Sequence, residues 1–271
     1  MSFDPSAIKR GQRMMWAQGD YAAISWPLEQ AAALLIERSG AGAGVEMLDV
    51  ATGTGNVAIP AAARGASVTG LDITPELLAI ARARAEEGQL DASFIEGDAE
   101  QLPFEDASFD LVTSSFGVMF APQQQQAADE LVRVARPGAR IAVAAWTPEG
   151  LNGTMFRTVA SYMTPPPPEL RPPVMWGVED HVSGLFASSG AELSFERHSV
   201  TFTHDSPESW VESNERLLGP TIVAKAALEP QGRYEQLRAE LIVLYSEANE
   251  AEDGTFAARA EYLLTLATLP A

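Results

Sequence analysis

Stretches of apolar residues alternate with helix-forming stretches through the first half of the chain, and this alternation limits the fold more than any other feature. The apolar stretches are typical of buried strands, because few polar residues interrupt them. Segments with helical periodicity, such as residues 56–64 and 123–134, stand between them. The alternation predicts βαβ units and a doubly wound α/β fold, with helices on both faces of a mostly parallel sheet. The expected strands cover residues 45–50, 67–71, 92–95, 109–114 and 139–146.

The pattern is less regular after residue 150. Four consecutive prolines at 165–168 exclude a regular helix or a central strand and predict a rigid extended connection, either a plain linker or part of a cover over a site. Residues 195–203 alternate like a strand, and residues 234–248 form an amphipathic helical pattern. Residues 262–269 fit either a final strand or a helix.

The chain is strongly acidic, with 37 acidic against 18 basic residues and a net charge of -19. Nucleic acids and anionic membranes are polyanions, so this balance argues against both as partners. The absence of cysteine excludes disulfides, thiolate metal sites and thiol nucleophiles. Residues 1–5 do not resemble a secretory signal and no apolar run approaches the ~20 residues of a membrane span, so we expect a cytoplasmic protein.

Acidic residues follow three successive predicted strands. Asp49 ends the first strand, just before the glycine-rich turn at 51–55, and Asp72 ends the second. Asp98 follows the third strand. Because ligands of such sheets bind beyond the carboxyl ends of the strands, we expect the three acids to converge on one ligand. The glycines let the backbone approach it closely, and a carboxylate at the Asp72 position can accept hydrogen bonds from ribose hydroxyls.

Two classes of cofactor fit the glycine-rich turn. The spacing Gly53-x-Gly55-x-x-Ala58 matches a relaxed dinucleotide fingerprint, and Asp72 suits the ribose of NAD(P) equally well. Asp49 favours the other class, because an acid beside the turn repels a pyrophosphate and attracts an amino or sulfonium group. We therefore expect S-adenosyl-L-methionine as the cofactor, with an NAD(P)-dependent oxidoreductase as the alternative.

A family resemblance supports this expectation. It rests on MLDVATGTG at 47–55, VTGLDITPE at 68–76, GDAEQLPF at 97–104, SFDLV at 108–112 and RVARPG at 133–138. With these motifs the chain resembles the class I S-adenosylmethionine-dependent methyltransferases, and most of all their ubiquinone/menaquinone C-methyltransferase-like branch. The motifs are specific for the cofactor and almost silent about the methyl acceptor.

The resemblance implies roles at the first two strand ends. The backbone of Ala51, Thr52 and Gly53 would hold the methionine part of the cofactor, and Asp49 would hold its amino group. Asp72 would bind the ribose hydroxyls. Each acid could instead have a structural role, Asp49 as a cap or in an ion pair near the end of the sheet, and Asp72 as a helix cap.

The resemblance also implies contacts to the adenine and to the transferred methyl. Ile73 would pack on the adenine, and Asp98 with the backbone of Ala99 would recognise its edge. Asp98 could instead only form a turn, since aspartate is favoured there. Ser115 or its neighbour Ser114, at the end of the fourth strand, would lie beside the methyl.

The acceptor side is less well defined. Tyr21 is the best candidate in the N-terminal segment, because the family folds that segment over the cofactor. His181 follows the prolines, where the family builds its acceptor pocket, and is a candidate base or acceptor contact; a helix cap or surface position is the alternative. Aromatic and methionine side chains outside the motifs suit an apolar pocket, or equally the core. They include Met14, Met15, Trp16, Phe116, Met119, Phe120, Met155, Phe156, Tyr162, Met163, Met175 and Trp176.

Together these features predict a single-domain methyltransferase that moves the methyl to a small, largely apolar acceptor, aromatic or quinonoid, by in-line displacement. A non-methylating S-adenosylmethionine-binding protein is a further alternative.

The family's seventh strand is antiparallel and lies next to last in the sheet, so residues 262–269 are assigned to it. The sequence does not determine the oligomeric state, for which a homodimer is one candidate. Within residues 1–271 we expect a helical cover at 1–40, a cofactor-binding core at 45–146, an acceptor-binding helical lid with the sixth strand at 151–258, and the final strand at 259–271.

Overall fold

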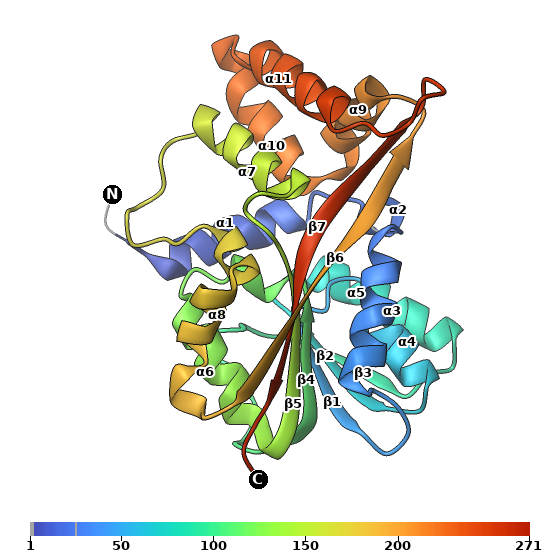
Figure 1. The fold of residues 1–271 in the computed structure, drawn as a ribbon, viewed down its shortest axis with the longest axis vertical. Helices are drawn as coiled ribbons and strands as arrows, with labels where there is room; N and C mark the ends of the chain where they lie inside the picture. The colour runs from blue at the N-terminus through green and yellow to red at the C-terminus, as the bar shows by residue number, and fades with distance from the viewer. Residues whose placement is uncertain (1–2, 25) are drawn as a thin grey trace.

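A computed structural model describes residues 3–24 and 26–271, which form one central sheet with helices around it (Figure 1). The strands are β1 (Glu46–Val50), β2 (Ser67–Asp72), β3 (Ala92–Glu96), β4 (Phe109–Ser115), β5 (Ala135–Trp146), β6 (Glu192–His204) and β7 (Phe256–Thr268). They lie in the order β3-β2-β1-β4-β5-β7-β6. β1 to β5 are parallel to one another, and β7 is antiparallel to both β5 and β6. The expected mostly parallel sheet, with its antiparallel last strand next to the edge, is confirmed.

Helices cover both faces of this sheet, as the alternating pattern predicts. The longer helices are α1 (Pro5–Trp16), α2 (Tyr21–Ile24), α3 (Leu28–Ser39), α4 (Ala58–Ala63), α5 (Pro75–Glu87), α6 (Gln124–Val134), α7 (Leu151–Tyr162), α8 (Glu179–Leu185), α9 (Pro207–Leu217), α10 (Gly219–Leu228) and α11 (Tyr234–Glu247). In Figure 1, α3, α4 and α5 lie on one side of the sheet and α6 and α8 on the other. None of the described helices is long and apolar enough to cross a membrane.

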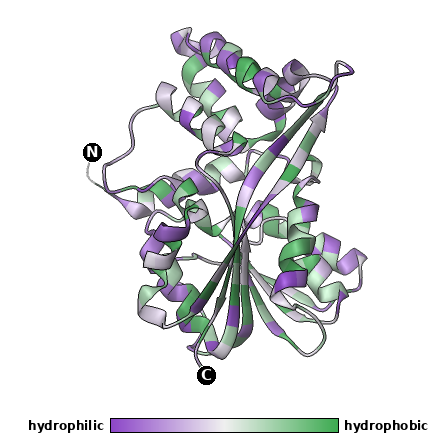
Figure 2. Cartoon of the chain, in the orientation of Figure 1, coloured by the Kyte–Doolittle hydropathy of each residue, from purple (hydrophilic) through white to green (hydrophobic). Residues whose placement is uncertain are grey.

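The core follows the sheet. Met47, Leu48, Leu111 and Val112 are fully buried on the central strands, and Figure 2 shows hydrophobic residues in the central sheet, while the helices around it carry both hydrophobic and hydrophilic residues. Burial on both faces explains why these strands are nearly continuous in apolar residues. The carboxyl ends of the strands are therefore fixed by a rigid core.

The last two strands continue beyond the rest of the sheet and support the helices α9, α10 and α11, which we call the lid. β7 pairs with β6 from Phe256 to Thr268, but with β5 only from Tyr262 onward. The ribbon formed by β6 and β7 therefore continues past the end of β5, and α9, α10 and α11 lie around its tip, with α7 beside them (Figure 1). Residues 262–269 belong to a strand that starts earlier, at Phe256, than the sequence indicates.

The proline-rich connection is extended, as predicted, and leads to a short 3-10 turn, η2 (Pro173–Gly177). This turn lies against the end of β5. An added Cβ at Gly177 would stand 2.2 Å from the carbonyl oxygen of Trp146 and 2.7 Å from Cα of Thr147. Only glycine allows these two backbones to approach so closely.

We therefore expect Gly177→Ala to lower the free energy of unfolding by about 2 kcal/mol, because the new methyl group forces η2 away from β5. Urea denaturation measures the change. Gly184→Ala in the neighbouring helix is the matched control, since its Cβ would meet nothing within 4 Å and alanine favours the helix. Equal losses in both variants would contradict the packing argument.

Candidate functional site

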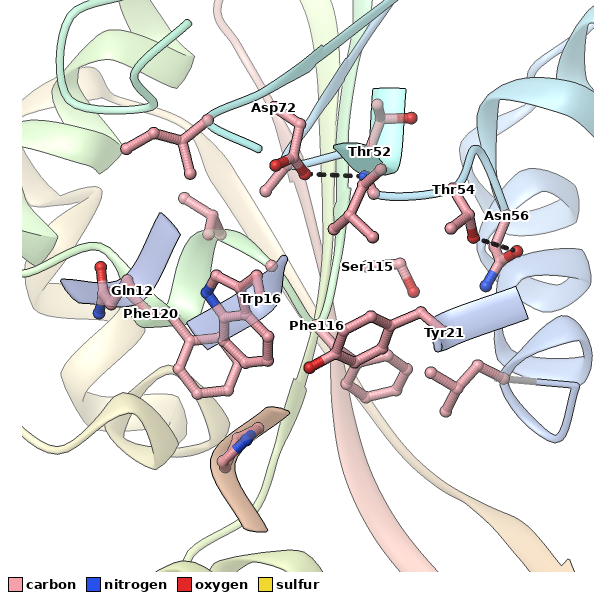
Figure 3. Close-up of a pocket in the computed structure, with 18 of the residues that line it drawn as sticks. Gln12, Trp16, Tyr21, Thr52, Thr54, Asn56, Asp72, Ser115, Phe116 and Phe120 are labelled. Atoms are coloured by element: carbon pink, nitrogen blue, oxygen red, sulfur yellow. Dashed lines mark hydrogen bonds between the residues drawn. The ribbon is translucent and has the colours of Figure 1, made fainter. Parts of the chain in front are cut away.

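One cavity of about 270 Å³ lies at the carboxyl ends of the parallel strands, beneath the lid. Its lining changes in character from one side to the other (Figure 3). We call the first part the acidic half, which is lined by Asp49, Ala51, Thr52, Gly53, Asp72, Ile73, Asp98 and Ala99. We call the second part the aromatic half, which is lined by Trp16, Tyr21, Phe116, Phe120, Trp146, Phe156, Phe202, Trp210 and Tyr245.

Asp49 lies at the bottom of the acidic half, at the end of β1, with only 1% of its surface exposed. The hydroxyl groups of Thr52 and Thr113 donate hydrogen bonds to its two carboxylate oxygens, at 2.6 and 2.7 Å. Burial nevertheless raises the pKa of Asp49 to about 6, with a smaller contribution from nearby Asp72. A buried carboxylate of this kind attracts a cation, because a positive charge beside it would stabilise its ionised form.

The turn after β1 lines the acidic half of the cavity with its backbone. Ala51 and Gly53 both have a left-handed φ of 55°, which strains a residue with a Cβ and is characteristic of functional turns. A Cβ on Gly53 would meet nothing within 4 Å, so the cavity is open above it. Gly117 packs directly against Ala51 from the other side, where a Cβ would lie 2.4 Å from that of Ala51. This tight packing holds the turn in place.

Asp72, at the end of β2, joins the turn to the next helix. Its Oδ2 accepts a hydrogen bond from the backbone N–H of Gly53 at 2.8 Å, and its Oδ1 from that of Thr74 at 2.8 Å. Burial raises the pKa of Asp72, and these backbone hydrogen bonds oppose the shift. Asp72 thus fixes the turn that leads into α5, whose N-cap is Thr74, and also lines the cavity. Each carboxylate oxygen has a further lone pair for a ligand hydroxyl.

Asp98 lines the cavity and is bound by a lysine that sequence reasoning did not single out. Lys9 Nζ on α1 lies 2.5 Å from Asp98 Oδ2 and 2.9 Å from Glu100 Oε2. Glu100 is 1% exposed and also accepts a hydrogen bond from the backbone N–H of Gln123. Lys9 therefore pairs with two acids at once and ties α1 over the acidic half.

Two further contacts hold the same helix. Gln12 Nε2 donates to the carbonyl oxygen of Phe120 at 2.7 Å, and Arg13 pairs with Glu96 at 2.7 Å with both side chains almost half exposed. These contacts hold α1 against the segment after β4, at Phe120, and against the end of β3, at Glu96. α1 has no fully buried residue, so these polar contacts add to the ring contacts that Trp16 makes with Tyr21 and Phe120.

The other predicted cofactor residues divide as follows. Ile73, Ala99 and Ser115 line the cavity. Ser114 does not, because its hydroxyl is buried, donating to the carbonyl oxygen of Val50 and accepting from the N–H of Val118. Tyr21 lines the cavity, and its hydroxyl accepts a hydrogen bond from the N–H of Gly219 at 3.1 Å.

Packed aromatic rings dominate the aromatic half. Phe116 and Trp146 stack with ring centroids 3.9 Å apart and planes inclined by 16°. Trp16 meets Phe120 edge to face at 4.8 Å, and Phe120 meets Phe156 at 5.9 Å. The rings come from α1, from the segment after β4, from β5 and from α7. Flat apolar walls of this kind suit a planar apolar molecule.

His181 is not brought to this cavity, contrary to its expected position near the acceptor. It lies on α8, where Nε2 is 2.8 Å from Oε1 of Gln124 on α6. Burial lowers the pKa of His181, and nearby Arg171 adds to the effect. The other histidines are also elsewhere: His198 pairs with Glu196, and the ring of His204 hydrogen-bonds Ser209. The proline-rich segment places α8 against α6, away from the cavity.

The structure adds residues that the motifs do not contain. Lys9, Trp210, Asn214 and Tyr245 all line the cavity from the cover and the lid. The sequence offers one indication that Lys9 is unusual, because it is one of only two lysines in the chain. The others lie in helices whose packing the sequence does not reveal.

We expect Lys9→Met to lower the free energy of unfolding by about 2 kcal/mol, because it leaves buried Glu100 without its cation. Hydrogen exchange should also become faster across α1. Arg13→Met, on the same helix but in an exposed pair, is the control and should change the free energy by under about 1 kcal/mol. A Lys9 variant as stable as the Arg13 variant would contradict this account.

The acidic half fits a cofactor with a cationic amino acid part and a ribose. In such a complex the buried Asp49 would meet the cation and Asp72 would meet the hydroxyls, while the open left-handed turn would admit the chain between them. A pyrophosphate would instead face Asp49 at close range, which disfavours the dinucleotide alternative.

Comparison with known proteins agrees with this assignment. Residues 48–143 match the family model of a methyltransferase domain. The uncharacterized protein Rv1403c of Mycobacterium tuberculosis is 47% identical over 190 residues, which are 70% of this chain and 69% of that protein. A demethylmenaquinone methyltransferase of Thermus thermophilus is 42% identical over 123 residues, 44% of this chain and 56% of that enzyme.

A solved structure gives the same result for the fold. The YcgJ protein of Bacillus subtilis superposes with a TM-score of 0.63 at 18% identity, over 89% of this chain and 99% of that one. Motifs, cavity and relatives thus agree on the cofactor, which is S-adenosyl-L-methionine. The chain belongs to the class I S-adenosylmethionine-dependent methyltransferases, in their quinone methyltransferase-like branch.

Proposed function

We propose that this enzyme transfers the methyl group to a small, largely apolar acceptor that is aromatic or quinonoid. The observation that carries the proposal is the continuity of the cavity, in which the acidic half opens directly into a half walled by stacked rings. A planar ring bound between these walls would lie next to the cofactor. The name of the Thermus thermophilus relative, which refers to a menaquinone precursor, supports a quinonoid acceptor.

The cofactor supplies a methyl group on a cationic sulfur, already activated for displacement. In the proposed complex, Asp49 binds the amino group, Asp72 the ribose hydroxyls, and Asp98 with Ala99 the edge of the adenine. Lys9 keeps Asp98 oriented beneath α1. Ile73 packs on the adenine, and Ser115 lies toward the methyl.

The protein contributes mainly position and exclusion of water. No histidine lines the described part of the cavity, and burial raises the pKa of Tyr21, so its hydroxyl stays protonated. In-line displacement gains most from holding the two reactants in contact, which the rings of Phe116 and Trp146 do for a planar acceptor. We therefore propose that no imidazole base takes part.

A labelling experiment tests the proposal. The enzyme is incubated with methyl-labelled cofactor and a cell extract, and the label is counted separately in the organic-soluble and macromolecular fractions. We expect label in organic-soluble aromatic compounds. Label in protein or nucleic acid alone would refute it, and cofactor binding without any transfer would favour the non-methylating alternative. Titration with NAD(P) examines the oxidoreductase alternative.

We expect Asp49→Asn to weaken binding of S-adenosylhomocysteine, whose amino group is retained, by at least about tenfold. The same change should raise the free energy of unfolding of the ligand-free protein at pH 8, on the order of 2 kcal/mol, because it removes a buried charge. Calorimetry and urea denaturation measure the two effects. Thr113→Val, which removes only a hydroxyl donor, is the control and should destabilise the protein. Undiminished binding by Asp49→Asn would be the contrary result.

The raised pKa of Asp49 also predicts a pH dependence. Its folded pKa is about 6 and its ordinary value is near 4, so the ligand-free protein loses stability as pH rises from 4 to 6 and regains none above. Binding of the ligand's ammonium group requires the carboxylate. The affinity for S-adenosylhomocysteine should therefore be constant between pH 7 and 8 and fall about tenfold by pH 5. A flat calorimetric profile down to pH 5 would disprove this role.

A further inference from the structure

Lys9 is the one cationic side chain that lines the cavity among the residues that the structure describes. It reaches the cavity from α1, and its Nζ meets Asp98 Oδ2 at 2.5 Å and Glu100 Oε2 at 2.9 Å. A positive charge is unexpected in a site for a cofactor whose sulfur is itself cationic, since like charges repel. Where Lys9 stands along the cavity is therefore informative.

The strand order places Lys9 at one end of the acidic half. β3, β2 and β1 are neighbours in that order. Asp49 and Asp72 lie at the carboxyl ends of β1 and β2, and Asp98 follows β3. In the proposed complex the amino acid part lies at Asp49, the ribose at Asp72 and the adenine at Asp98. Lys9 thus stands beside the adenine, at the end of the ligand away from the cationic sulfur.

The ammonium group of Lys9 has one N–H left for a ligand. An ammonium carries three, and Asp98 and Glu100 accept two of them. No described residue accepts the third. The group is nevertheless held in place, because Glu100 is 1% exposed and accepts hydrogen bonds from the backbone N–H and the side-chain amide of Gln123. Lys9 therefore brings an oriented donor to the cavity wall.

Asp98 and Lys9 together present an acceptor next to a donor. The carboxylate of Asp98 is fixed, because its Oδ1 accepts from the backbone N–H of Glu100 at 2.9 Å, and its oxygens have further lone pairs. Adenine has the complementary pattern on one edge, where an amino group donates and the ring nitrogen N7 accepts. The ring nitrogen on the other side of the amino group, N1, is left to the backbone N–H of Ala99.

We infer that Lys9 donates its third N–H to N7 of the adenine while Asp98 accepts from the adjacent amino group; this inference rests on the proposed function. Lys9 is then a residue that binds the cofactor as well as one that attaches α1. The pair also selects the base. Hypoxanthine keeps N7 but would turn a carbonyl oxygen toward the carboxylate of Asp98, and a base without N7 loses the charge-assisted hydrogen bond.

Two analogues of S-adenosylhomocysteine test the inference by calorimetry. The 7-deaza analogue has a C–H group in place of N7, and the 1-deaza analogue has one in place of N1. The wild-type protein should bind the 7-deaza analogue about tenfold more weakly than S-adenosylhomocysteine. The 1-deaza analogue should also bind more weakly, because it loses the contact to Ala99. Equal affinities for S-adenosylhomocysteine and the 7-deaza analogue would overturn the inference.

Substitution of Lys9 separates a direct contact from a structural role. Lys9→Met should bind S-adenosylhomocysteine about tenfold more weakly and the 7-deaza analogue equally well, to within about twofold, while the penalty for the 1-deaza analogue stays. A lysine that only attached α1 would weaken all three ligands by one factor, and a Lys9→Met variant that still prefers N7 tenfold would overturn the inference. Arg13→Met, on the same helix but outside the cavity lining, is the control and should keep the wild-type preference.

A second variant covers a failure of Lys9→Met to fold. That change leaves buried Glu100 without its cation, whereas Lys9→Met combined with Glu100→Gln removes both charges and should show the same three affinities relative to one another. A weaker 1-deaza analogue with no loss for the 7-deaza analogue refutes the Lys9 contact and leaves the adenine placement of the proposed function standing. Equal affinities for all three ligands refute that placement and the inference with it.

Discussion

The reversal of strand order at β1 is the constraint on which the site depends. β2 and β3 continue the sheet on one side of β1, while β4 and β5 continue it on the other. The chain therefore leaves β1 and β4 in connections that run to opposite sides, and a crevice opens between them. Asp49 and the left-handed Ala51 stand at one wall of this crevice, and Ser115 and Phe116 at the other. The acidic half and the aromatic half of the cavity become neighbours in this way.

Features of this site lower the free energy of unfolding of the ligand-free protein. Asp49 keeps a charge in a buried position, and Ala51 has strained backbone. Each feature opposes folding and becomes favourable when a matching ligand group arrives. The rigid sheet tolerates them because its core is fully buried. The cover is different, since α1 is fastened by the polar contacts of Lys9 and Gln12, which a ligand can displace.

The residues of the acidic half could be predicted from the sequence, whereas most of those of the aromatic half could not. Strand ends follow from apolar periodicity, and parallel strands bring their carboxyl ends together, so Asp49, Asp72 and Asp98 could be assigned to one edge in advance. Trp210 lies far along the chain, and only the β6–β7 ribbon and the packing of α9 bring it to the cavity. The assignment of His181 rested on its distance from the prolines along the chain, and the contact between α8 and α6 holds it elsewhere.

The central claim is that one cavity holds the cofactor on its acidic side and the acceptor on its aromatic side. A crystal structure with S-adenosylhomocysteine tests it most directly. The account predicts the ligand's amino group at Asp49, its ribose hydroxyls at Asp72, and its sulfur facing the stacked rings of Phe116 and Trp146. A sulfur directed away from those rings, or a ribose bound elsewhere, would contradict the account.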